Sequence, residues 1–359
     1  MVNVLQARIA MLLIGIDEAG YGPKIGPLCH GYCAFRSSDT NDGAVSDLWQ
    51  LLHPSVMRHP ARPGSITVDD SKKIYSSAQG LQLLQRGVRA FLECMASSSI
   101  AQNDLTDQRV AIYQALLPEC DRAKLEEDAW GCLGNESDDL PANVGVNDQA
   151  AMTMRSGKKA KLSVAPALEH ISLLRETLNN AGVSVVALGA RAMSAKYYNA
   201  ALAQIGNKAD VSWNIILAEF VTLLKLARPG EHIHITIDRQ SGRKFYASRI
   251  STLFPDAFTW IEVETQQKSV YRIEAPDRVA HVAFMVAGDR HSLPVALGSM
   301  AAKLIRELCM QRFNAFFRSH DPNLKPTAGY YCDTIRFLKE TQSMRKRLVI
   351  QNHKLVRVK

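Results

Sequence analysis

Two adjacent carboxylates, Asp17 and Glu18, stand at the end of a short apolar run and are the first residues that could do chemistry. The run Met11–Ile16 is rich in Leu and Ile and contains a glycine, which is typical of a buried strand. Side chains alternate faces along a strand, so both carboxylates can approach one cation only where the backbone turns. Hard divalent cations prefer such oxygen ligands. The pair therefore indicates a metal site, and the exposed acidic turn of a hairpin is the simpler alternative.

The residues that follow could bring the backbone close to a ligand. Gly20, Gly22 and Gly26 have no side chains, and their bare amides can bind a phosphate. A second apolar run covers residues 28–35. A dinucleotide-binding loop is the other function to consider for glycines after a strand. The glycine spacing differs, however, a strand rather than a helix follows, and two carboxylates would repel a pyrophosphate.

The string from Gly15 to Pro27, GIDEAGYGPKIGP, resembles the signature of type 2 ribonuclease H (ribonuclease HII), G-[IV]-D-E-[AV]-G-R-G-P-x-x-G-P. It departs at one position, because Tyr21 stands where the family has Arg. Less specific blocks of resemblance cover Thr67–Ile74, Ile233–Asp238 and Ala287–Leu338. The resemblance implies a ribonuclease H-like α/β fold, in which a mixed central sheet is flanked by helices, with insertions.

Two more carboxylates are implied by the resemblance. The alternating run His232–Ile237 predicts a strand that ends in Asp238, and the family's third acid ends such a strand. Asp289 matches the fourth acid, because it precedes the helical string Gly298–Glu307 by the family's spacing. Extra strands between these two acids leave Asp277 as an alternative to Asp289.

The resemblance makes the four acids both catalytic residues and ligands of two Mg²⁺ or Mn²⁺ ions. These acids are Asp17, Glu18, Asp238 and Asp289. Several carboxylates are needed because two divalent ions require many hard oxygen ligands. Two such ions roughly 4 Å apart would clamp a scissile phosphate.

Other residues are expected to bind the substrate. Ser71 and Lys72, in the string DDSKK, match a second family motif at a strand-to-helix junction, where a hydroxyl, amides and an ammonium group can meet a phosphate. A helix cap followed by solvated lysines is the simpler alternative. The resemblance assigns contact with the sugar and its 2′-hydroxyl to Gly20, Tyr21, Gly22 and Tyr330.

The implied activity is hydrolysis of the RNA strand of RNA–DNA hybrids, or of duplexes with embedded ribonucleotides, to 5′-phosphate and 3′-hydroxyl ends. Discrimination against DNA must come from the 2′-hydroxyl. Two other functions stay open. Because Tyr21 alters the element that reads the ribose, a ribonuclease H-like nuclease could act on another nucleic-acid structure. The basic surface could also serve a non-catalytic hybrid-binding protein.

Composition is compatible with a nucleic-acid partner. The 359 residues carry a net charge of +8, which suits a polyanion. The seven cysteines form no CxxC pair and are interpreted as reduced thiols of a cytoplasmic protein. No apolar run is long enough to span a bilayer, and the first residues lack the features of a signal peptide. We expect a cytoplasmic monomer without membrane contact.

The chain is expected to form a single ribonuclease H-like catalytic domain over residues 1–359, with an insertion at 103–161 and a basic C-terminal tail at 345–359. The insertion contains an acidic stretch, 126–139, and a basic stretch, 155–161, and is either a solvated arm or a lid over the substrate. Further strands are predicted at 66–68, 183–188, 258–264, 269–273 and 279–286. Helices are predicted at 77–95, 107–117, 166–181, 210–226, 294–317 and 333–344.

Overall fold

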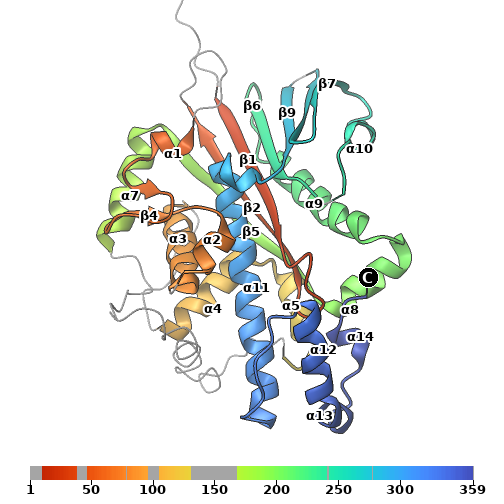
Figure 1. Ribbon diagram of the computed structural model, residues 1–359. Coiled ribbons are helices and arrows are strands. Elements are labelled where there is room, and N and C mark those ends of the chain that lie inside the picture. Colours follow the sequence, from red (N-terminus) through yellow and green to blue (C-terminus); the bar gives the residue numbers. More distant parts are fainter. Residues whose placement is uncertain are drawn as a thin grey trace, which may run out of the picture.

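A seven-stranded mixed sheet forms the centre of the protein, in the strand order β5-β2-β1-β6-β9-β8-β7 (Figure 1). The computed structural model describes residues 10–38, 47–77, 79–95, 105–130, 168–240, 242–276 and 278–358. The strands are β1 (Met11–Ala19), β2 (Leu28–Ser37), β5 (Val183–Met193), β6 (His232–Asp238), β7 (Phe258–Glu264), β8 (Lys268–Ala275) and β9 (Arg278–Met285). A small second sheet pairs β3 (Val56–Met57) with β4 (Ile66–Thr67). The predicted α/β fold, a mixed central sheet flanked by helices, is confirmed.

Strand β1 lies in the middle of the sheet and determines where the acidic residues meet. It pairs antiparallel with β2 and parallel with β6, and β6 pairs parallel with β9. Ile16 is paired with Ile237, so Asp17 and Asp238 are the next residues along two neighbouring strands. The carboxyl ends of parallel strands meet at one edge of a sheet, and the turn after β9 carries Asp289 to the same edge.

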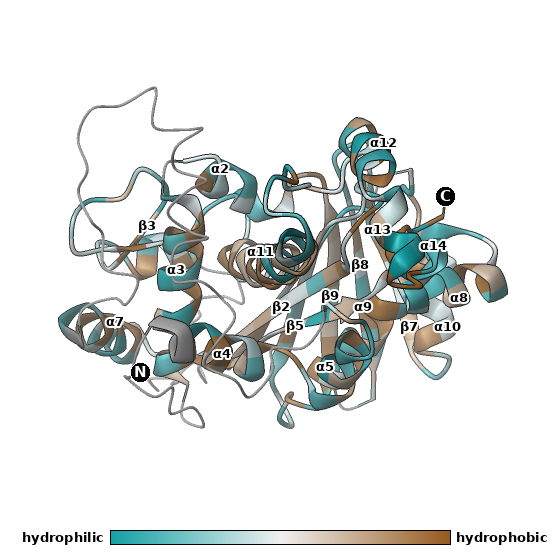
Figure 2. Cartoon of the chain, turned by 90° about the horizontal axis from the view of Figure 1, so that it is seen from below, coloured by the Kyte–Doolittle hydropathy of each residue, from teal (hydrophilic) through white to brown (hydrophobic). Residues whose placement is uncertain are grey.

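Helices cover both faces of the sheet. On one face lie α11 (Leu293–His320), α3 (Gly80–Cys94), α4 (Leu105–Leu116) and α7 (Leu168–Asn180), which share a core with the odd-numbered residues of β1. On the other face lie α9 (Lys208–Leu224) and α10 (Ala247–Leu253). Figure 2 shows α11 nearly end-on, between α3 and the strands. The remaining helices are α1 (Leu48–Leu51), α2 (Ser71–Tyr75), α5 (Glu119–Glu126), α8 (Ala195–Ile205), η2 (Gly288–Arg290), α12 (Tyr331–Glu340), α13 (Gln342–Arg347) and α14 (Asn352–Leu355).

Glycines allow α11 to lie directly on the strands. A Cβ atom on Gly31 would lie 1.9 Å from the carbonyl oxygen of Gly298, and one on Gly15 would lie 2.1 Å from the backbone nitrogen of Val295. A side chain at either position would therefore push the helix away from the sheet. This close approach brings Ser299 of α11 next to the acidic end of β1.

The main predicted strands and helices are present, with three informative differences. Strand β1 continues to Ala19, because its pairing with β2 includes Asp17 and Glu18. Strand β5 continues to Met193, because β2 pairs with it over its whole length. The segment 345–358, expected as a basic tail, includes α14, in which Leu355 is buried.

Several predictions fall outside the described residues. They concern Asp277, most of the acidic stretch 126–139, and the basic stretch 155–161, so the role of the insertion as arm or lid stays a prediction. The described part of the insertion forms α4 and α5. No helix within the described ranges has the length and apolar character needed to cross a membrane.

Candidate metal centre

Three predicted ligands converge at the sheet edge. Carboxylate oxygens of Asp17, Glu18 and Asp238 all lie within 4.8 Å of one another. The first two come from the end of β1 and the third from the end of β6, so parallel pairing of the strands brings them together. All three donors are carboxylate oxygens, which is the donor set that Mg²⁺ and Mn²⁺ prefer, and the residues therefore fit such an ion.

The fourth predicted ligand, Asp289, lies beside this group without joining it. It belongs to η2 and is 9% exposed. The preceding residue, Gly288, donates its amide hydrogen to Oδ1 of Asp238 over 2.7 Å, which ties η2 to the end of β6. Burial raises the pKa of Asp289 to about 6, together with repulsion from Asp70 and Asp238.

The carboxylates repel one another strongly. Burial raises the pKa of Asp17 well above its usual value, and repulsion from Asp238 and Glu18 raises it further. Burial also raises the pKa of Glu18 to about 7, helped by repulsion from Asp238 and opposed by attraction to Lys72. Like charges at this separation are held together only when protons or cations compensate them. A divalent cation would relieve the repulsion.

Two buried hydroxyl groups form a short chain of hydrogen bonds that ends at Asp17. Ser299 forms a side-chain hydrogen bond with Asp17, which lowers the pKa of that carboxyl. The Oγ atom of Ser299 lies 2.9 Å from Oγ of Ser71, and both serines are buried. Ser71, at the start of α2, is therefore a buried partner of Ser299, and its contact with a phosphate stays a prediction.

Lys72, also on α2, is the predicted substrate residue that lies among the charges of the centre. Burial disfavours its ammonium group, but attraction to Asp17, Asp70 and Asp238 raises its pKa overall. A positive charge here partly compensates the carboxylates. It also lies where the phosphate of a bound substrate would need a partner.

The glycine loop 20–27 leaves β1 beside the carboxylates. Gly20 has a φ of 86°, and a Cβ atom there would lie 2.7 Å from the carbonyl oxygen of Pro27, so only glycine fits. A Cβ atom on Gly22 would meet nothing within 4 Å. Among the described residues, the amides of Gly20, Tyr21 and Gly22 donate to no backbone or side-chain acceptor. They are thus placed to bind an oxygen of a ligand.

Tyr21 contacts a lysine that sequence reasoning missed. The ammonium nitrogen of Lys208, the first residue of α9, lies 3.9 Å from the centroid of the Tyr21 ring. The same lysine attracts Glu18 and lowers the pKa of that carboxyl. A positive charge therefore stands beside the glycine loop although Tyr21 itself carries none.

Tyr330 lies at the start of α12, next to the glycine loop. The carbonyl oxygen of the adjacent Gly329 accepts hydrogen bonds from the amides of Lys24 and Ile25, at 2.7 and 3.2 Å. The Tyr330 side chain is 58% exposed. No hydrogen bond or ring contact joins it to the carboxylates in the described part of the chain, so its role at the sugar stays a prediction.

Three further residues of the centre were not predicted as site residues. Asp70 precedes Ser71 in the string DDSKK and repels Asp289, and its position beside a predicted residue was a usable signal. Ser299 belongs to the helical string Gly298–Glu307, which served only to locate Asp289. Lys208 has no local signal, because its place depends on how α9 packs against the loop.

An open hollow borders the centre on the side of α2. It is lined by Arg58, Asp69, Asp70, Lys73 and Arg290. Arg290 follows Asp289 directly and lies 3.5 Å from Asp70. Its cationic side chains are paired within the hollow: Arg58 and Lys73 with Asp69, at 3.7 and 2.7 Å, and Arg290 with Asp70.

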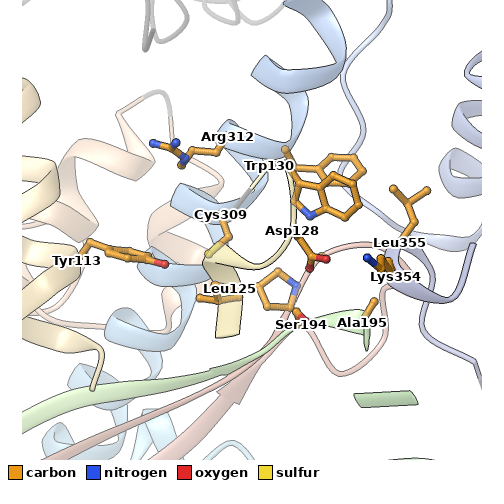
Figure 3. A pocket seen from close by; sticks show the side chains of 13 residues that line it. Tyr113, Leu125, Asp128, Trp130, Ser194, Ala195, Cys309, Arg312, Lys354 and Leu355 are labelled. Atoms are coloured by element: carbon orange, nitrogen blue, oxygen red, sulfur yellow. The ribbon is translucent and has the colours of Figure 1, made fainter. Parts of the chain in front are cut away.

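A second cavity contains none of the four predicted carboxylates. Its lining includes Asp128, Trp130, Ser194, Arg312 and Lys354, and Figure 3 shows Asp128, Ser194 and Lys354 pointing into the same space. Burial raises the pKa of Asp128 to about 6. This carboxylate is therefore a buried acid outside the metal centre and serves below as a control.

No model of a known protein family matches the chain, and no curated protein matches its sequence. Among solved structures, the chain is similar to a chain of the PCNA:RNase HII complex from Archaeoglobus fulgidus, with 14% sequence identity and a TM-score of 0.37, over 97% of this chain and 95% of that one. It is also similar to ribonuclease H2 from Pyrococcus horikoshii OT3, with 12% identity and a TM-score of 0.34, over 96% and 92% of the two chains.

Proposed function

We propose that this chain is a divalent-metal-dependent endonuclease of the ribonuclease H type, which hydrolyses the RNA strand of RNA–DNA hybrids. The observation that carries the proposal is the convergence of the oxygens of Asp17, Glu18 and Asp238 within 4.8 Å. Carboxylates that repel one another at the edge of a sheet lower the stability of the fold, and metal binding gives them a function.

The proposed ligands are Asp17, Glu18 and Asp238, with Asp289 completing the set for two ions. Bound Mg²⁺ or Mn²⁺ would supply a Lewis acid for the phosphate and a water molecule of lowered pKa. The protein's part is to hold the donors still. Ser299 orients Asp17, and the amide of Gly288 orients Asp238.

Recognition of the RNA strand is assigned to the glycine loop. The amides of Gly20, Tyr21 and Gly22 have no acceptor among the described residues and could donate to a ribose 2′-oxygen. Lys72 on one side and Lys208 on the other would contact phosphates of the bound strand. The net charge of +8 favours the same polyanionic partner.

The test is a cleavage assay on three labelled duplexes: a continuous RNA–DNA hybrid, a DNA duplex with one embedded ribonucleotide, and plain DNA. Each is incubated with wild type, with Asp17→Asn, and with Asp128→Asn as a matched substitution of a buried acid outside the centre. We expect Mg²⁺- or Mn²⁺-dependent cleavage of the hybrid by wild type and Asp128→Asn, and none by Asp17→Asn. Efficient cleavage of plain DNA would favour a nuclease for another structure. Binding of hybrid without cleavage would favour a non-catalytic protein.

A further inference from the structure

Two buried arginines donate hydrogen bonds to carbonyl oxygens of the glycine loop. Arg306 of α11 donates to the carbonyl oxygens of Pro27, Ile25 and Ala328, at 3.0, 3.3 and 3.1 Å. Arg357, which follows α14, donates through Nη2 to the carbonyl oxygens of Gly20 and Pro23. Four carbonyls of the loop are therefore held on the side of the arginines.

These arginines are unusual because they are buried without a carboxylate partner. Arg306 is 3% exposed and Arg357 is 4% exposed. Neither forms an ion pair with a carboxylate in the described part of the chain. Burial lowers the pKa of Arg357 to about 10, and repulsion from Arg306 contributes. A buried cation that faces only carbonyl oxygens is costly to the fold, so a role in shaping the loop accounts for its presence.

The segment that carries Arg357 is fixed to the loop and to α8. Val356 forms a β-bridge with Ile25, and the amide of Arg357 donates to the carbonyl oxygen of Lys24 over 2.8 Å. Asn199 of α8 donates to the carbonyl oxygens of His353 and Val356, both at 2.8 Å, and accepts from the amide of Val358. These contacts fix the backbone around Arg357 to the glycine loop and to α8.

We propose that Arg357 is a positioning residue of the active centre, and that the segment 352–358 is a brace for the glycine loop. By binding the carbonyls of Gly20 and Pro23, it holds in one arrangement the backbone of the loop, in which the amides of Gly20, Tyr21 and Gly22 have no acceptor among the described residues. The inference rests on the proposed function for its consequence in catalysis, and on the hydrogen bonds of Arg357 and Asn199 for the brace itself. Arg357 touches neither the carboxylates nor the substrate.

Replacing Arg357 should weaken recognition of the hybrid more than it slows the chemical step. Both hydrogen bonds to the loop come from Nη2 of Arg357. Arg357→Lys keeps a positive charge, but its ammonium nitrogen stands one bond nearer the backbone than Nη2 and falls short of the two carbonyl oxygens. A loop displaced by about 1 Å loses roughly a hundredfold in efficiency when its amides must meet one oxygen. We expect this loss to appear mainly in KM for the hybrid, with kcat changed less than about threefold, and the preference for hybrid over DNA to shrink.

The experiment compares Arg357→Lys with Arg36→Lys, which alters an arginine that donates to Glu231 and to the carbonyl oxygen of Leu226, at the end of β2 away from the loop. Hydrogen exchange of the amides of Lys24 and Ile25, which donate to Gly329, reports on the loop without any substrate. We expect faster exchange there in Arg357→Lys only. The metal-dependent rise in melting temperature should be unchanged in both variants.

The outcomes distinguish failure of the brace from failure of the proposed function. If wild type does not cleave the hybrid but Arg357→Lys still loosens the loop, the brace stands and the proposed function falls. If Arg357→Lys matches Arg36→Lys in loop exchange and in KM, the brace is refuted. Should Arg357→Lys fail to fold, Asn199→Ala, which releases the segment while keeping both arginines, must loosen the loop in the same way, and an unchanged loop in that variant would also refute the brace.

Discussion

Removing one negative charge from the carboxylate group should stabilise the metal-free protein and abolish its response to metal. Burial raises the pKa of Glu18 to about 7 from the usual 4.5. Because the folded-state pKa is raised, the carboxyl costs stability as pH rises above 4.5, and the full cost is reached above pH 7. A shift of this size corresponds to about 3 kcal/mol.

Glu18→Gln should therefore be more stable than wild type by about 3 kcal/mol in EDTA at pH 8, and by less than about 1 kcal/mol at pH 5. With an unfolding entropy of about 2.1 cal/mol/K per residue over 359 residues, the gap at pH 8 is about 4 °C in melting temperature. Mg²⁺ at a hundred times its dissociation constant would add about 2.7 kcal/mol to wild type. The difference in melting temperature between wild type and Glu18→Gln should then nearly vanish, because the variant lacks one ligand and metal stabilises it little.

The assay is thermal unfolding of both proteins at pH 5 and pH 8, in EDTA and in increasing MgCl₂ or MnCl₂. Asp128→Asn is the control, because burial raises the pKa of that carboxyl to about 6 outside the metal centre. It should gain stability at pH 8 and keep the full metal response. A Glu18→Gln variant that responds to metal like wild type, or that shows no gap in EDTA, would refute the assignment of Glu18 as a ligand.

Four more predictions follow from the same contacts. Asp238→Asn should keep the fold, judged by circular dichroism, but lose roughly a thousandfold in cleavage, since a charged metal ligand is worth several kcal/mol; near-normal turnover in Mg²⁺ and Mn²⁺ would exclude it as a ligand. Lys72→Ala should weaken binding of hybrid and plain DNA alike and reduce the salt slope of log K by about one, and an unchanged slope would mean that the lysine is merely solvated. Tyr21→Arg should raise cleavage at a single embedded ribonucleotide by roughly tenfold, because a guanidinium adds a charge-assisted phosphate contact that a phenol lacks; a wild type that already prefers the single ribonucleotide, with no gain in the variant, would contradict this. Burial raises the pKa of Glu219 well above its usual value, so the melting temperature of wild type should fall relative to Glu219→Gln as pH rises above about 4.5, and parallel profiles would contradict the shift.

The sheet edge with its acids could be predicted because the signals are local. The run Met11–Ile16 before Asp17 and the alternation His232–Ile237 before Asp238 each describe a strand that ends in a carboxylate. Their parallel pairing was not predictable from periodicity, which says nothing about neighbours in a sheet. The family resemblance implied only that the acids converge from separate strand ends, and the parallel pairing of β1 with β6 brings Asp17 and Asp238 to one edge.

The positions of Lys208 and Arg357 could not be predicted from local sequence signals. Lys208 opens a helix whose buried face is visible in the sequence, but the position of its ammonium group over Tyr21 depends on tertiary packing. Arg357 stands in a basic segment, where composition favours solvated side chains. Its burial against carbonyl oxygens of the glycine loop reverses that expectation.

Different parts of the chain position the carboxylates and the glycine loop. The carboxylates of Asp17 and Asp238 are positioned by the pairing of β1 with β6, and their mutual repulsion favours cations over any neutral ligand. The amides of the glycine loop carry no net charge, and their arrangement depends on guanidinium groups that face carbonyl oxygens instead of carboxylates. Because the two arrangements share no hydrogen bond, changes on the strand should affect metal binding and changes in the brace should affect recognition of the ribose. Under the proposed function, substitutions at Tyr21 and Arg357 should therefore change substrate preference without altering the carboxylate centre.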